Sequence, residues 1–140
     1  MIPALRTSLS GLNAASESMS ARADNIVNAR TSARVDEVDL SPAARGTTPP
    51  EDVFRPYRVT NQSVRGGGVE TEVEPVEPSH EVVYDPDDPN ADAEGRVALP
   101  NVSLEEEIVG MRRDRTYWMA NLAVMRTADE MSGYLLDEEA

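Results

Sequence analysis

The chain has 140 residues, enough for one domain, and its 26 acidic against 13 basic residues give a formal net charge of −13. Such a charge repels nucleic acid and anionic lipid, so we expect no nucleic-acid partner and no direct lipid binding. The lack of cysteine excludes disulfides and cysteine metal sites, and 39% hydrophobic residues are too many for a simple disordered acidic tail.

Targeting signals are also missing from the sequence as given. No run of about 20 apolar residues predicts a membrane span. The residues after Arg6 are too polar for the apolar part of a secretory signal. We therefore expect a protein that stays in the cytoplasm or leaves by a route that needs no cleaved signal.

An amphipathic helix is predicted over residues 3–29. Pro3 suits the first turn, where its missing N–H costs nothing. Apolar residues then recur in alternating steps of three and four, the heptad pattern of helices that pack knobs into holes. This stripe consists of Ile2, Leu5, Leu9, Leu12, Met19, Ala23 and Ile26, with Ser16 as its one polar position.

The middle of the chain, residues 35–100, is rich in proline and is predicted to form short strands and turns. Residues 70–94 contain ten acids and no arginine, and residues 41–50 have the composition of a flexible linker. In the second strand, valine and threonine alternate with glutamate, which predicts one buried face. The expected strands lie at residues 54–59, 69–74, 81–84 and 96–99.

A second long helix is predicted from Ser103, which forms a capping box with Glu106. It should span about 29 residues, with Gly133 near its fraying end. Its apolar stripe is interrupted at Arg115. Two single-stripe helices at opposite chain ends predict pairing, either as the private core of a helical hairpin or in an assembly with other chains. The second stripe consists of Leu104, Ile108, Met111, Trp118, Leu122 and Met125.

Convergent reactive groups are lacking, so we expect no catalytic residue, no cofactor and no metal, and the chain should not be an enzyme. The single histidine, His80, is expected at the surface or in a subunit contact. Asp88, Asn90 and Asp92 match the first three ligand positions of a calcium loop, but the loop glycine and the closing glutamate are absent. A solvated acidic turn is the preferred interpretation.

Two segments carry a resemblance to a known family. The run at residues 23–31, Ala-Asp-Asn-Ile-Val-Asn-Ala-Arg-Thr, resembles the N-terminal signature of flagellar basal-body rod and hook proteins. Residues 83–102 resemble the segment before the last helix in the C-type proximal rod proteins of the bacterial flagellum, and residues 56–58 resemble that family's start of the central strands. The run at 115–121 is one residue longer than the family pattern, which leaves open whether Tyr117 or Trp118 faces the core; the stripe favours Trp118.

The resemblance implies a mainly α fold with a small β region. Long N- and C-terminal helices would pair as an antiparallel coiled coil, with residues 1–34 and 101–140 as a helical rod domain and residues 35–100 as a linker and β-rich extension. It further implies a structural subunit of the proximal rod in the basal body, exported without a cleaved signal peptide through the type III export apparatus.

Partners implied by the resemblance are other copies of the chain, other rod proteins and the inner-membrane ring or its adaptor. A soluble helical-hairpin adaptor that captures an amphipathic helix remains the alternative. Besides the two apolar stripes, three asparagines of the family motifs are expected to pack between subunits, namely Asn25, Asn28 and Asn121.

Overall fold

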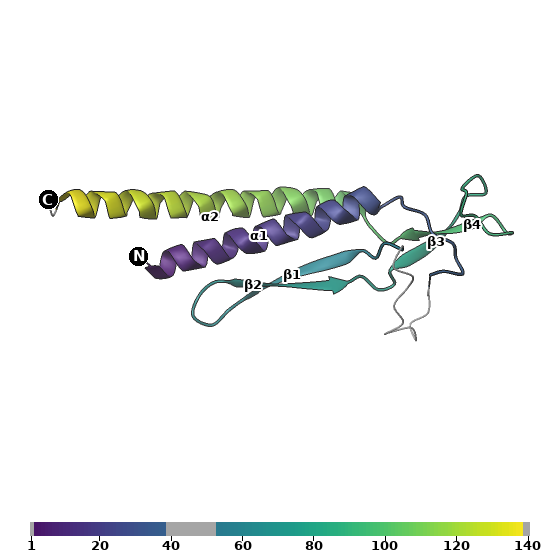
Figure 1. Cartoon of the computed structure of the whole chain (residues 1–140), viewed down its shortest axis with the longest axis horizontal. Helices are drawn as coiled ribbons and strands as arrows, with labels where there is room; N and C mark the ends of the chain where they lie inside the picture. Colours follow the sequence, from purple (N-terminus) through teal and green to yellow (C-terminus); the bar gives the residue numbers. More distant parts are fainter. Residues whose placement is uncertain (1, 39–52, 139–140) are drawn as a thin grey trace.

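The structure, a computed structural model, describes residues 2–38 and 53–138, with side chains for residues 3–38 and 53–134. Long helices form the two chain ends, and four short strands lie between them in the sequence (Figure 1). The expected linker at residues 41–50 lies outside the described residues. The elements are α1 (Ile2–Asn28), β1 (Tyr57–Ser63), β2 (Val69–Pro75), β3 (His80–Tyr84), β4 (Arg96–Pro100) and α2 (Leu104–Glu138).

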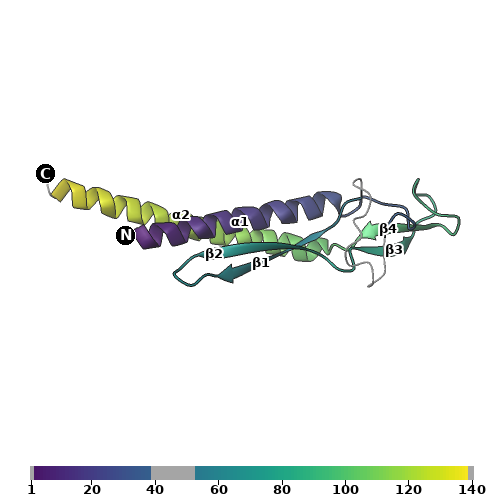
Figure 2. The same cartoon turned by 60° about the horizontal axis from the view of Figure 1, so that its bottom comes forward.

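The two helices lie side by side and run in opposite directions (Figures 1 and 2). The first helix is confirmed to within a residue at each end. At the start of α2, the Ser103 hydroxyl accepts the Glu106 N–H at 3.4 Å, as the predicted cap requires. The predicted end is wrong, because α2 has 35 residues and continues through Gly133. A single helical glycine costs only about 1 kcal/mol, and the residues around Gly133 favour a helix.

The strands form two separate antiparallel hairpins. β1 pairs with β2 from Tyr57 opposite Pro75 to Ser63 opposite Val69, and the turn between them uses three glycines with positive φ. β3 pairs with β4. All four predicted strands are present, but β1 begins three residues and ends four residues later than the predicted 54–59. The buried face expected for β2 is only partly formed, because Val73 is 41% exposed.

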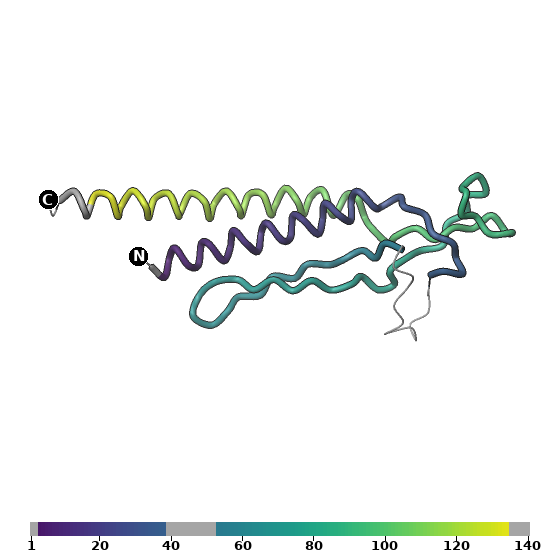
Figure 3. The backbone as a smooth tube through the Cα atoms, in the orientation of Figure 1, coloured from purple at the N-terminus to yellow at the C-terminus, as the bar shows by residue number. Residues whose placement is uncertain are grey.

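The β1–β2 hairpin folds back along the helices, whereas the β3–β4 hairpin lies beyond the end of α1 (Figure 3). The segment after α1 joins β4 through a bridge in which Ala33 and Ala98 exchange two 2.9 Å hydrogen bonds. A small apolar cluster of Ala33, Val38 and Ala98, with Val53 packed against it, holds this end together. The helical part of the chain lacks a comparable cluster of large buried side chains within the described residues.

Candidate functional site

The contact between α1 and α2 is made by small and polar residues, not by the predicted apolar stripes. Gly11 lies against Asn121, so that a Cβ at Gly11 would come within 2.7 Å of the Asn121 side chain. Gly110 lies against the Arg22 guanidinium in the same way. Such positions let the two backbones approach closely. The buried residues of the two helices, within the described side chains, are small or polar: Ser8, Ala14, Ala15, Ser18 and Asn25 on α1 and Gly110, Asp114 and Ala128 on α2.

An ion-pair network joins the helices near the start of α2. Arg22 donates from Nε to Asp114 Oδ2 at 2.9 Å and from Nη1 to Glu107 Oε2 at 2.6 Å. Asp114 is nearly inaccessible, with 3% of its side chain exposed. Burial lowers the pKa of Arg22, but the hydrogen bonds and charges of Asp114 and Glu107 outweigh burial and raise the pKa above its usual value. The guanidinium therefore stays charged and holds both carboxylates.

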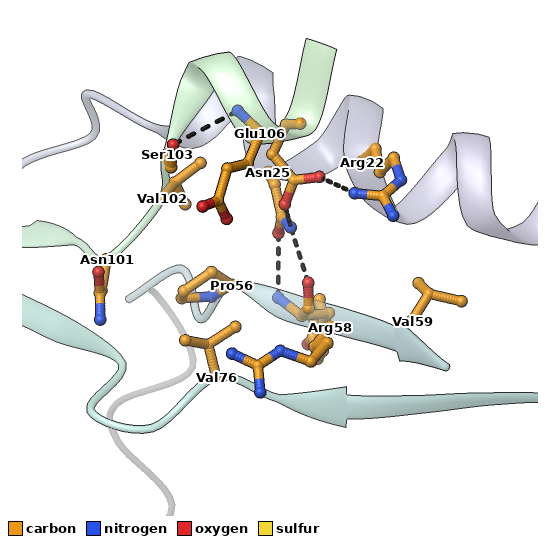
Figure 4. Close-up of a pocket in the computed structure, with 12 residues that line it drawn as sticks. Arg22, Asn25, Pro56, Arg58, Val59, Val76, Asn101, Val102, Ser103 and Glu106 are labelled. Carbon is orange, nitrogen blue, oxygen red and sulfur yellow. Dashed lines mark hydrogen bonds and ion pairs between the residues drawn. The ribbon is translucent and has the colours of Figure 1, made fainter. Parts of the chain in front are cut away.

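Asn25 extends this network to the first strand (Figure 4). Its Oδ1 accepts the Tyr57 N–H at 3.0 Å, and its Nδ2 donates to the Tyr57 carbonyl at 2.7 Å. The same Nδ2 donates to Glu107 Oε1 at 2.6 Å, so the Glu107 carboxylate bridges Asn25 and Arg22. We call these four side chains, Arg22, Asn25, Glu107 and Asp114, the polar junction. It fixes α1, α2 and β1 at one point.

Two serines hold the rest of the β1–β2 hairpin on α1. The Ser10 hydroxyl donates to the Val69 carbonyl and accepts the Val69 N–H, both at 2.7 Å. Asn61 Nδ2 donates to Ser18 Oγ at 3.2 Å. Together with Asn25, these contacts attach the hairpin along one side of α1 through hydrogen bonds. These hydrogen bonds involve none of the apolar stripe residues.

The apolar stripes lie on the side of the helix pair that the hairpin does not cover. Most stripe residues follow a residue of the interhelical contact by one position, as Leu12 follows Gly11 and Leu122 follows Asn121, which is a rotation of about 100° around the helix. Because the helices run in opposite directions, this rotation turns both stripes to the same side. We call this surface the apolar face. It consists of Leu5, Leu9, Leu12, Met19, Ala23 and Ile26 on α1 and Leu104, Ile108, Met111, Trp118, Leu122 and Met125 on α2.

Exposure is high on the apolar face for a region of large hydrophobic side chains. Leu9 is 49% and Ile108 45% exposed, and the other members are half-buried. Trp118 is half-buried on this face, whereas Tyr117 is 56% exposed. The side chain of Ile2 lies outside the described side chains. Exposed apolar surfaces of this kind are typical of protein–protein contacts.

The three motif asparagines lie away from the apolar face. Asn25 is 1% exposed and belongs to the polar junction. Asn28 Nδ2 donates to the Asp24 carbonyl at 2.8 Å, and Asn121 Nδ2 donates to the Tyr117 carbonyl at 2.9 Å while its side chain lies against Gly11. All three therefore make contacts within the chain itself.

The prediction for His80 was wrong, since the side chain is 2% exposed at the start of β3. Its Nδ1 lies 2.9 Å from Ser79 Oγ, and Nε2 is buried without a partner of normal hydrogen-bond geometry. Burial lowers the pKa of His80, the Phe54 backbone raises it and the charge of Arg55 lowers it, with a net decrease. The ring therefore stays neutral near pH 7, as part of the packing at this end of the molecule.

The carboxylates of the acidic turn are occupied by partners from the chain. Asp88 Oδ1 accepts from the Ser32 hydroxyl at 3.0 Å and the Asn90 N–H at 2.8 Å, and Asp92 Oδ2 accepts from Arg96 Nε at 2.9 Å. The Arg96 backbone N–H, aided by its guanidinium, lowers the pKa of Asp92. Over residues 2–38 and 53–138, no group of three or more His, Cys, Asp or Glu side chains could hold a metal ion.

The fold and this site are those of a structural protein, with long terminal helices around a short-stranded middle and an apolar face open to other molecules. None of the helices in the described part of the chain is long and apolar enough to cross a membrane. Relatives among curated proteins identify the family. No profile of a known protein family matches the chain.

The flagellar basal-body rod proteins FlgC of Salmonella typhimurium (strain LT2) and Salmonella typhi are each 30% identical to it over 122 residues, covering 87% of this chain and 85% of the relative. The FlgC protein of Agrobacterium fabrum (strain C58) is 31% identical over 136 residues, covering 91% and 87%. The chain therefore belongs to the FlgC family of flagellar basal-body rod proteins. The resemblance inferred from the sequence is confirmed, and it favours the rod hypothesis over the adaptor alternative.

Proposed function

We propose that this chain is a structural subunit of the proximal rod of the flagellar basal body, packing with other copies and other rod proteins to transmit torque across the periplasm. Membership of the FlgC family supports the rod assignment. The observation that carries the packing role is the apolar face, which the chain's own hairpin leaves uncovered. Leu9 and Ile108 are about half exposed there.

The spacing of the apolar face suits helix-on-helix packing between subunits. Heptad stripes on both helices would accept side chains of neighbouring helices as knobs in holes, so the antiparallel pair would form a coiled coil with other subunits. Burying a large aliphatic side chain fully contributes about 1.5–3 kcal/mol. A close-packed interface of this kind resists deformation, which a shaft under torque requires.

The two parts of the chain would have different roles in the rod. Residues 1–34 and 101–140 would form the helical rod domain, while residues 35–100 would contact neighbours at another radius. A contact between unlike surfaces of successive subunits does not close and so generates a helical array. Further partners would be the inner-membrane ring or its adaptor, and the export apparatus that delivers the subunit without a cleaved signal.

A charge placed on the apolar face tests this function. Leu122→Asp, or Leu12→Asp on α1, should abolish rod assembly and motility, because a carboxylate cannot be buried in an apolar interface without a partner. Ala123→Asp is the matched control: it adds the same charge one residue away, at an exposed position that points away from α1. Swimming motility and isolated basal bodies give the readout, and circular dichroism checks that each purified variant is helical.

The control variant should assemble and swim like the parent. Normal rods with Leu122→Asp and Leu12→Asp would contradict the proposal. An equal loss of rod assembly and motility with Ala123→Asp would show that the effect is not specific to the apolar face.

A further inference from the structure

We propose that copies of this chain contact one another side by side through opposite charges. The acidic outer face of the β1–β2 hairpin of one copy would meet an arginine cluster on the outer side of α2 of the next copy. This inference rests on the proposed function, since it describes how neighbouring subunits in the rod are held in position. Its partner is a second copy of this chain.

The acidic hairpin face consists of Glu70, Glu72 and Glu74 on β2, all exposed. Thr71 lies between the first two, and its hydroxyl donates to Asn61 Oδ1 at 3.0 Å on the side of α1. Because successive strand residues point to opposite sides, the glutamates point away from α1.

Neighbouring groups on this face leave its charge negative. Gln62 Nε2 donates to Glu72 Oε2 at 3.2 Å, which adds no charge. Arg58, opposite Glu74 in the strand register, is the one cation of β1. Three carboxylates and one guanidinium thus give a face that would attract a cationic surface.

The arginine cluster consists of Arg112, Arg113 and Arg115 on α2, all exposed, and Arg115 is also the position at which the apolar stripe is interrupted, so the cluster borders the apolar face. Asp114 points toward Arg22 of α1, so Arg112, two residues earlier, lies about 200° around the helix and faces away from α1. Among the described residues, neither Arg112 nor Arg115 has an ion pair, and Arg113 reaches only 4.0 Å from Asp114. Three neighbouring cations repel one another unless acidic groups approach them.

The two surfaces lie at the same position along the molecule. The contact of Asn61 with Ser18 places the middle of the hairpin beside Ser18. Along α1, Arg22 meets Asp114 and Gly11 meets Asn121, so Ser18, between Gly11 and Arg22, lies level with the part of α2 that carries the cluster.

Figures 1 and 2 together show the hairpin beside both helices, since it lies below α1 in Figure 1 and over the first half of α2 in Figure 2. The acidic face and the cluster therefore lie on different sides of the molecule, and a second copy placed alongside in a rotated orientation would bring one surface against the other. Such a contact joins unlike surfaces, which builds an open array and not a closed dimer. Exposed ion pairs are individually weak, so this contact would set the alignment while the apolar face supplies most of the free energy.

The chain contains no cysteine, which makes disulfide cross-linking a direct test. Equal amounts of full-length Glu72→Cys and Arg112→Cys chains, mixed and mildly oxidised, should give mainly the mixed dimer. A chain carrying both substitutions should give a ladder of longer oligomers. Glu81→Cys replaces Glu72→Cys in the control, because Glu81 is an exposed acid of the other hairpin and should not cross-link to position 112.

Charge reversal tests the same contact without a disulfide. Glu72→Arg and Arg112→Glu should each weaken self-association about three- to tenfold in sedimentation experiments, and the two together in one chain should restore it to within about twofold. Restoration by the double variant and formation of the 72–112 cross-link would support the inference.

The inference would be overturned if the 72–112 cross-link does not form and the double variant does not restore self-association. The proposed function would still stand in that case if Leu122→Asp abolishes rod assembly. Cross-linking of position 112 in isolated basal bodies to a different rod protein, and not to position 72, would also overturn it. If Leu122→Asp assembles normally, the proposed function fails and this inference fails with it.

Discussion

Asn25 shows how one side chain of the family motif links helix to strand. Its amide offers an acceptor and a donor to the backbone of Tyr57, which is what a neighbouring β-strand would offer. Aspartate at this position could accept but not donate, and it would place a second carboxylate beside Glu107. The asparagine thus replaces a missing strand neighbour at the start of β1.

Gly110 leaves the space that the Arg22 guanidinium of the polar junction occupies. A Cβ there would overlap the Arg22 guanidinium, which is held by Asp114 and Glu107. We expect Gly110→Ala to displace Arg22 and lower the free energy of unfolding by about 2–4 kcal/mol, because it leaves buried carboxylates without their cation. Urea unfolding of the purified chain, followed by circular dichroism, measures the change.

Gly133→Ala is the matched control, since a Cβ at that helical position meets nothing within 4 Å. It should stabilise the chain by about 0.5–1 kcal/mol through helix propensity alone. Equal stabilisation by both substitutions would show that Arg22 moves aside at no cost and that the polar junction contributes little.

Among the elements, the β1–β2 hairpin is attached to α1 chiefly through hydrogen bonds, so it should be sensitive to single serines. Ser10→Ala removes both hydrogen bonds to Val69 and should destabilise the chain by about 1–2 kcal/mol, although alanine favours the helix. Hydrogen exchange should speed up at the Val69 amide and along the hairpin.

The control for this prediction is Ser20→Ala, an exposed position of the same helix. It should raise stability by a few tenths of a kcal/mol without changing exchange in the hairpin. Unchanged exchange at Val69 in Ser10→Ala would mean that the hairpin is held elsewhere.

At this scale the sequence predicted which elements form, but not how they meet. Turn glycines and valine–glutamate alternation are local signals, and they located β2 well, whereas β1 lies three to four residues later than the predicted 54–59. The heptad pattern predicted that large apolar residues would form the contact between the helices. The contact instead includes residues that precede this stripe by one position, such as Gly11, and the buried Ser18 belongs to the same row. That row has the same spacing, but small residues give no hydropathy signal. The burial of His80 depends on segments distant in sequence.

For the whole molecule, the unequal distribution of charge and apolar surface determines how copies can approach. The net charge of −13 repels copies at long range, whereas the apolar face and the arginine cluster act only at contact. Salt screens the long-range repulsion first, because the Debye length falls from about 30 Å at 0.01 M to about 8 Å at 0.15 M. Partly buried pairs at an interface are screened much less.

Self-association of the purified chain should therefore increase as salt rises from about 0.01 M to 0.15 M, as measured by sedimentation velocity. Asp85 and Asp87 are exposed acids of the β3–β4 turn, outside both proposed contacts. Replacing both with asparagine makes the chain less negative, so it should strengthen association at low salt and change little at about 0.15 M. Association that weakens steadily over this range would mean that ion pairs at the contact contribute more to the binding free energy than the net repulsion removes. The apolar face would then not be the main source of binding free energy.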